Sequence, residues 1–113
     1  MALKKEIELE NGVILNYHRI TSFNKITNVV DIIEISSYIS KSQRDKEHEY
    51  QLVQKKSANN EELTPKEQEI LSNGINVFID TEYINIPYDE SMTIESAYEY
   101  LRATEKYKNA INI

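Results

Sequence analysis

Two histidines are the first side chains to consider for chemistry, because imidazole changes its charge close to neutral pH. His18 and His48 lie 30 positions apart in the chain. Alternation in the surrounding residues predicts that His18 lies on an apolar face, where a buried imidazole can serve as a general base or a ligand. More often such a histidine is a structural or interface residue whose ring nitrogens are hydrogen-bonded. His48 lies in a charged segment, and we expect it to face solvent.

Carboxylates are plentiful in the last third of the chain, at Asp80, Glu82, Asp89, Glu90, Glu95 and Glu99. Paired carboxylates can hydrolyse glycosides or hold magnesium. Asp80 and Glu82, however, also fit ordinary exposed positions on one face of a strand. No phosphate-binding loop, calcium loop or nucleophile elbow is present, and the chain has no cysteine. We therefore assign no catalytic, cofactor-binding or metal-ligating residue, and an enzyme using the acidic cluster ranks last among the functions considered.

Tyrosine is unusually frequent: the chain has 8 tyrosines and no tryptophan. Tyrosine combines a large apolar ring with a polar tip and is enriched where proteins meet. Alternation places several of these side chains away from the predicted core, which predicts a protein interface formed by Tyr38, Tyr83, Tyr88 and Tyr100. The competing interpretation is that about half of the tyrosines pack at the edge of the core.

The elements that must position these side chains begin with a β-hairpin. Asn11-Gly12 is typical of a two-residue type I′ turn, and alternating segments flank it. This turn predicts a register with Leu9 opposite Ile14 and Lys5 opposite His18. The core face would carry Leu3, Ile7, Leu9, Ile14 and Ile20. Residues 21–28 are predicted to form a loop, with short strand character as the alternative. Residues 29–39 are predicted to form a third strand with Ile33, Ile35 and Ile39 on one side.

The second half is predicted to contain helices on either side of a strand. Residues 41–73 are charged and poor in apolar residues, so we expect a helical insertion that is largely solvated or packed on a partner. Thr64 and Glu67 match a capping box, with Pro65 at the first helical position. Residues 75–86 are apolar on both faces, which predicts a central strand ended by Pro87. A last helix follows Thr93, with its core stripe at Ile94, Ala97, Tyr98 and Leu101.

Together these elements predict an α+β fold in a single domain spanning residues 1–113. It would be a small antiparallel sheet of about four strands, with the C-terminal helix on one face and the insertion 41–73 between strands 3 and 4. The chain is short enough that its core must be modest.

Charge restricts the partners. The chain carries 13 basic and 19 acidic residues, a net charge of −6, which argues against nucleic acid or an anionic membrane as the partner. Residues 1–56 carry a net +1 and residues 57–113 a net −7. Such asymmetry favours electrostatic association with copies of the chain or with other proteins. With neither a membrane span nor a signal peptide in view, we expect a cytoplasmic protein.

Several segments carry a resemblance to a known group. The chain resembles small uncharacterised proteins encoded in the tail, baseplate and fibre modules of bacteriophages and prophages of low-GC Gram-positive bacteria. The resemblance covers most of the chain outside 41–73 and depends on residues 3–12 (LKKEIELENG), 15–20 (LNYHRI), 33–38 (IEISSY), 76–84 (NVFIDTEYI) and 93–101 (TIESAYEYL). The group has no catalytic motif, so the resemblance implies a setting and not particular residues.

The resemblance implies a non-enzymatic structural or assembly protein of a phage tail or baseplate. Its partners would be identical subunits in a homo-oligomer, phage tail proteins, or both. Its location would be the host cytoplasm and, once assembled, the virion tail. The alternative is a phage-encoded inhibitor or adaptor that binds a host protein through its acidic surface.

Overall fold

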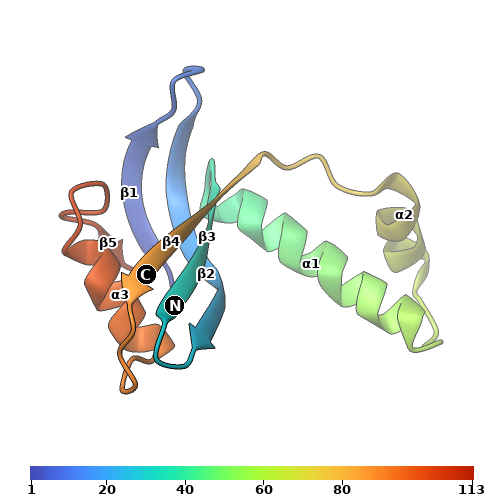
Figure 1. Ribbon diagram of the computed structural model, residues 1–113. Coiled ribbons are helices and arrows are strands. Elements are labelled where there is room, and N and C mark those ends of the chain that lie inside the picture. The colour runs from blue at the N-terminus through green and yellow to red at the C-terminus, as the bar shows by residue number, and fades with distance from the viewer.

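The computed structural model describes residues 1–113 as a sheet with a helical extension (Figure 1). The elements in order are β1 (Leu3–Glu8), β2 (Ile14–Ile26), β3 (Val30–Tyr38), α1 (Lys41–Ala58), α2 (Pro65–Asn73), β4 (Ile79–Pro87), α3 (Ile94–Arg102) and β5 (Ile111–Asn112). The sheet is antiparallel, with strand order β4-β3-β2-β1-β5. The predicted α+β class, the C-terminal helix and the helical insertion between strands 3 and 4 are confirmed.

The first hairpin forms, but its turn differs from the predicted one. Leu9 and Val13 are joined by a backbone hydrogen bond of 2.8 Å, and the Gly12 N–H donates to the Leu9 carbonyl. The loop therefore has three residues and ends at Gly12, whose φ of 86° favours glycine. Ile14 consequently pairs with Glu8 and is 40% exposed. The prediction that Ile14 belongs to the core was wrong, because Ile14 is the first residue of β2, next to the turn, and lies outside the core cluster.

A bulge in β1 shifts the register again beyond the turn. The pairing changes between Lys4 and Ile7, so Leu3 and not Lys5 lies opposite His18. Residues 21–28 are likewise not a loop for most of their length, because β2 continues through Ile26. The chain then turns at Asn28, which has a positive φ of 63°. The polar residues of this stretch led to the prediction of a loop, but the stretch is a strand with one solvated face.

Strand β4 is an edge strand, and the prediction of a central strand was wrong. It pairs with β3 along its whole length and has no second neighbour. The misleading signal was Ile75 and Phe78, which precede the strand and are 41% and 38% exposed. The segment 74–78 is extended but belongs to no strand. Its apolar residues therefore do not indicate burial in the middle of a sheet.

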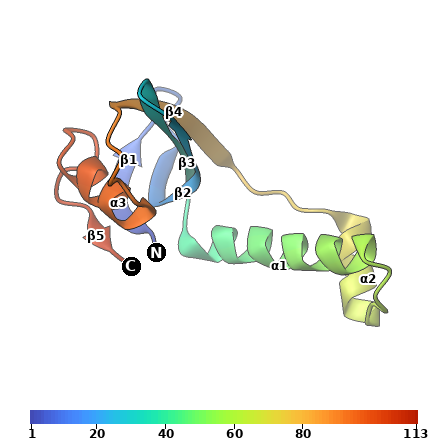
Figure 2. The same cartoon turned by 60° about the horizontal axis from the view of Figure 1, so that its bottom comes forward.

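The core lies between the sheet and α3, which covers one face (Figure 2). Thr93 caps α3 as predicted, and Ala97, Tyr98 and Leu101 are buried, whereas Ile94 is 53% exposed. Their main neighbours in the core are Leu3, Ile20, Ile33, Ile35, Ile86, Tyr107 and Ala110. After α3 the chain returns to the sheet, where β5 pairs with β1 and adds a fifth strand.

Helices α1 and α2 and the segment 74–78 extend away from the sheet, and we call them the helical arm (Figures 1 and 2). The radius of gyration of 16.5 Å exceeds the roughly 13 Å expected for a compact chain of this length. Thr64 and Glu67 form the predicted capping box, with Pro65 in the first turn, and Gly74 ends α2. No helix combines the length and apolar character that a membrane crossing requires.

Replacing Tyr98 with phenylalanine tests how α3 is fastened to the sheet. The Tyr98 hydroxyl accepts a hydrogen bond from the Ile20 N–H (2.8 Å) and donates one to the Met1 carbonyl (2.9 Å). Tyr98→Phe leaves that buried N–H unpaired, so we expect the free energy of unfolding to fall by about 1–3 kcal/mol in urea titrations. Tyr100→Phe, on the exposed side of α3, should change it by less than about 0.5 kcal/mol. Equal effects of the two variants would contradict this account.

Candidate functional site

The root of the helical arm is a buried polar cluster centred on the Glu47 carboxylate. Its Oε1 atom accepts hydrogen bonds from the Tyr38 hydroxyl and from Arg44 Nη1, both at 2.7 Å. Arg19 Nη1 lies 3.8 Å from the same oxygen and donates to the Tyr38 hydroxyl at 3.4 Å. Glu47 is only 8% exposed. One carboxylate thus joins α1 to strands β2 and β3.

Tyr38 therefore does not form the exposed surface that its sequence position predicted. It is fully buried, and its ring packs edge-on against Tyr17 with 5.8 Å between centroids. Burial raises the pKa of its hydroxyl, and the Glu47 carboxylate raises it further. The alternation rule put Tyr38 on the face opposite the core, which is correct, but α1 covers that face at this point. Tyr38 is a structural anchor of the arm.

The other tyrosines predicted to form an interface lie apart from one another. Tyr83 on β4 is 67% exposed, and Tyr100 on α3 is 37% exposed. Tyr88 is half-buried in the loop after β4. These three positions belong to three different elements, so the structure does not gather the four predicted tyrosines into one patch.

His18 belongs to a second buried cluster, on the α3 side of the sheet. Its Nε2 lies 2.7 Å from the Lys5 carbonyl and its Nδ1 lies 2.7 Å from Ser37 Oγ. Since a carbonyl can only accept, Nε2 carries the proton and the Ser37 hydroxyl donates to Nδ1. The ring also meets Tyr107 edge-on, with 5.4 Å between centroids. A serine donating to an imidazole is the arrangement of an activated nucleophile.

The serine–histidine pair can act on a substrate only if solvent and substrate can reach it. Ser37 is 5% exposed and His18 is 1% exposed. Two hollows open on the molecular surface, and neither is lined by either residue. With both ring nitrogens satisfied inside the fold, the geometry supports the structural interpretation of His18.

Two carboxylates of the last third, Glu82 and Asp89, have hydrogen-bond partners within the fold. Glu82 accepts a hydrogen bond from the Tyr107 hydroxyl at 2.7 Å and forms an ion pair with Lys106 at 3.0 Å. Burial raises the pKa of Tyr107, and the Glu82 carboxylate adds to this shift. Asp89 is exposed, and hydrogen bonds from the Ser91 hydroxyl and backbone lower the pKa of its carboxyl. No three acidic or histidine side chains are grouped so that they could hold a metal ion.

Two charged residues with structural roles were not singled out in the sequence. Glu47 lies among many charged neighbours in α1, and only its spacing from Arg44, three residues earlier, hints at a pair. Asp31 is fully buried and accepts a hydrogen bond from the Asp89 backbone N–H at 3.0 Å through Oδ2, while Oδ1 has no partner. Asp31 lies between apolar residues at the start of β3, and this position was the available signal.

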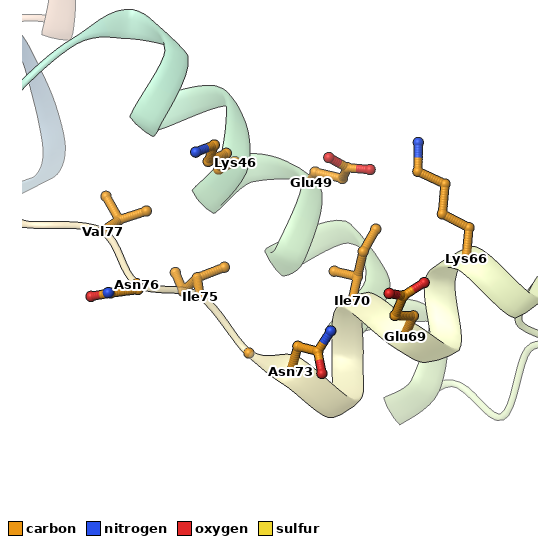
Figure 3. Close-up of a pocket in the computed structure, with 10 residues that line it drawn as sticks. Lys46, Glu49, Lys66, Glu69, Ile70, Asn73, Ile75, Asn76 and Val77 are labelled. Atoms are coloured by element: carbon orange, nitrogen blue, oxygen red, sulfur yellow. The ribbon is translucent and has the colours of Figure 1, made fainter.

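The helical arm has a solvent-facing groove that is partly lined by apolar side chains. A groove of about 450 Å³ runs between α1, α2 and the segment 74–77 (Figure 3). Its apolar lining is Ile70, Ile75 and Val77, and its charged lining is Lys46, Glu49, Lys66 and Glu69. Within the arm only Val53 is a buried apolar residue, whereas Leu52 is 50% exposed. The groove can accept an apolar side chain flanked by charges of either sign.

Comparison with protein-family models, with curated proteins and with solved structures found no match for this chain.

The pH dependence of His18 gives one test of the second cluster. Burial lowers the pKa of His18 below its ordinary value of 6.5, although the hydrogen bond to the Lys5 carbonyl opposes the shift. The unfolded chain then binds more protons than the folded chain below pH 6.5, so His18 lowers the stability of the fold as the pH falls through 6.5 towards its folded pKa. The slope contributed cannot exceed about 1.4 kcal/mol per pH unit.

We expect the His18 ring proton in an NMR titration of the folded protein to change its chemical shift with a midpoint below 6.5. The variant His48→Gln leaves His18 as the only histidine and so assigns the signal. A midpoint at or above 6.5 would show that the ring is not desolvated as described.

Replacing Glu47 tests the first cluster. Glu47→Ala leaves Arg44 and the Tyr38 hydroxyl without their buried acceptor, so we expect a loss of about 2 kcal/mol in the free energy of unfolding and faster amide hydrogen exchange in α1. The matched control is Asp45→Ala, which removes an exposed ion pair with Lys41 and should cost less than about 0.5 kcal/mol. Unchanged exchange in α1 after Glu47→Ala would mean that something else holds the arm.

Proposed function

We propose that this protein acts without catalysis, as a structural or assembly protein whose function is contact with other proteins through the helical arm. The observation that carries the proposal is the groove of the arm, which exposes apolar side chains on an element standing away from the core (Figures 2 and 3). An exposed apolar patch that is rimmed by polar and charged side chains is typical of an interaction site.

The energetics of the arm favour a partner. Most of the stability of a helix in a protein comes from packing an apolar face against other elements and not from intrinsic propensity. In this arm the packing is limited to Val53 and the contact of α1 with α2, supported by the ion pair between Lys56 and Glu67 at 2.9 Å. A partner that covers Leu52, Ile75 and Phe78, each 38–50% exposed, would stabilise the complex by on the order of 1 kcal/mol per side chain.

The setting we propose is the tail or baseplate of a bacteriophage or prophage, where the partner is a tail protein. The basis for this setting is the resemblance of the segments outside residues 41–73 to small proteins of tail modules. Because the groove is lined by two lysines and two glutamates, the partner surface should present an apolar residue between charges of both signs.

An inhibitor or adaptor that binds a host protein is the second candidate, and one observation favours it. Outside residues 41–73 the chain carries 7 basic and 12 acidic residues, so most of the net charge lies on the sheet and α3. Such a surface favours a basic host partner. This candidate differs from the first in its location, since it would be absent from the assembled particle.

The test is capture of partners by the full chain in cells producing the phage, combined with mass spectrometry of purified particles. We expect tail proteins to be captured and the protein to be present in the particles. Ile75→Asp, which places a charge in the groove, should reduce capture at least tenfold, because an unpaired charge at an apolar contact costs well over 1.4 kcal/mol.

The matched control is Val29→Asp, an exposed apolar residue in the turn between β2 and β3 (67% exposed), which should capture tail proteins normally. Circular dichroism verifies that both variants remain folded. Absence from particles together with capture of a host protein would favour the adaptor. Equal capture by both variants would exclude the groove as the contact surface.

A further inference from the structure

The free edge of β4 is the most regular unpaired backbone in the molecule. All nine residues of β4 pair with β3, from Ile79 opposite Tyr38 to Pro87 opposite Val30, without a bulge. The backbone groups that point away from β3 have no strand beside them. The opposite edge of the sheet ends instead in β5, which has only two residues.

Edge strands of monomeric proteins are usually protected against pairing by lysines, inward-pointing charges, prolines or bulges. Strand β4 contains no lysine, and its one proline is the last residue of the strand. Its charges are Asp80 and Glu82, and Glu82 is already engaged by Lys106 and Tyr107. Tyr83, at the middle of the strand, is 67% exposed. The edge is thus long and regular, and of these protections it carries only its two carboxylates, which lie on the α3 face.

We propose that a second copy of the chain pairs with this edge, β4 against β4, around a two-fold axis at Tyr83. An antiparallel pair of identical strands requires such an axis normal to the sheet. Because Tyr83 is the central residue of Ile79–Pro87, this register pairs the whole of both strands. The two five-stranded sheets then form one continuous sheet.

The charges of β4 disfavour the registers that are shifted towards the N-terminal end of the strand, and registers shifted towards its C-terminal end pair fewer residues of Ile79–Pro87. With the axis at Tyr83, Glu82 lies opposite the partner's Ile84 and Asp80 lies opposite the partner's Ile86. An axis at Glu82 would place that carboxylate opposite its own copy, and an axis at Thr81 would place Asp80 opposite the partner's Glu82. Like charges directly opposite each other destabilise a strand pair, whereas an aromatic pair such as Tyr83 with the partner's Tyr83 stabilises it.

The proposed contact does not depend on the helical arm. The arm joins β4 at its N-terminal end (Figure 1), so the two arms of the dimer would leave the joined sheet at opposite ends. The dimer would then present two grooves, one at each end. Loss of the edge contact should leave binding by a single arm intact, and Ile75→Asp should leave the dimer intact, so the two proposals fail separately.

The test uses the absence of cysteine from the chain. Residues directly opposite in an antiparallel pair have Cα atoms about 4.5–5.5 Å apart, within the range of a disulfide. Tyr83→Cys should therefore cross-link to its own copy under mild oxidation. Thr81→Cys and Asn85→Cys should each stay uncross-linked when alone and should cross-link when the two variants are mixed. The reaction is oxidation of two thiols to one disulfide by added oxidised glutathione, which is reduced.

Light scattering on the unmodified full chain gives the second measurement, with an expected mass of twice the monomer. Tyr83→Lys, which adds the charge that protected edges carry, should return the protein to a monomer while circular dichroism shows an unchanged fold. The proposal is overturned by a monomeric unmodified chain, by a dimer that survives Tyr83→Lys, or by Thr81→Cys cross-linking alone as readily as Tyr83→Cys. If a different protein occupies the β4 edge, the unmodified chain alone will be a monomer, and the proposal is overturned.

Discussion

The Glu47 carboxylate is the contact on which the shape of this molecule depends. Both polar side-chain links between the helical arm and the sheet, from Tyr38 and from Arg19, end on its Oε1 atom. Arg44 forms an ion pair with the same oxygen from within α1, so a residue of the arm itself also orients the carboxylate. In a site that is largely shielded from water, such charge-assisted bonds are stronger than their exposed counterparts. The direction of the arm therefore depends on one buried residue and on the two chain connections at its ends.

The two faces of the sheet have different roles, because one packs against the apolar core and the other anchors the helical arm. On the α3 face the apolar core surrounds a satisfied polar group, His18, held between Ser37 and the Lys5 carbonyl. On the other face a polar cluster anchors an arm that contributes little to the core. A chain of this size has a limited core, and here residues 41–78, about a third of the chain, belong to the arm and its connections. Surface that does not stabilise the monomer is available for partners.

The sequence predicted those parts of the fold that depend on local chemistry. The capping residues Thr64 and Thr93, the stop at Gly74 and the buried stripe of α3 were all predictable from hydrogen-bonding groups within a few residues. Register and neighbour identity were not, since a three-residue loop and one bulge changed the pairing of β1 with β2, and nothing local shows that β4 lacks a second neighbour. The same distinction holds for the candidate site. The exposure of Tyr83 follows from strand alternation, whereas the burial of Tyr38 depends on contact with Glu47 of α1, which no local pattern shows.

Tyr38 and Tyr83 show why alternation alone cannot assign an interface. Both lie on the face of the sheet opposite α3, and both hydroxyls have a carboxylate neighbour that raises the pKa of the phenol, Glu47 for Tyr38 and Glu34 for Tyr83. The difference is that α1 leaves the sheet directly after Tyr38 and covers it, while no element follows β4 across Tyr83. The connection that buries Tyr38 also carries the arm away from the sheet. The exposed arm therefore follows from the insertion between β3 and β4, whereas the exposed edge follows from the lack of a strand beside β4.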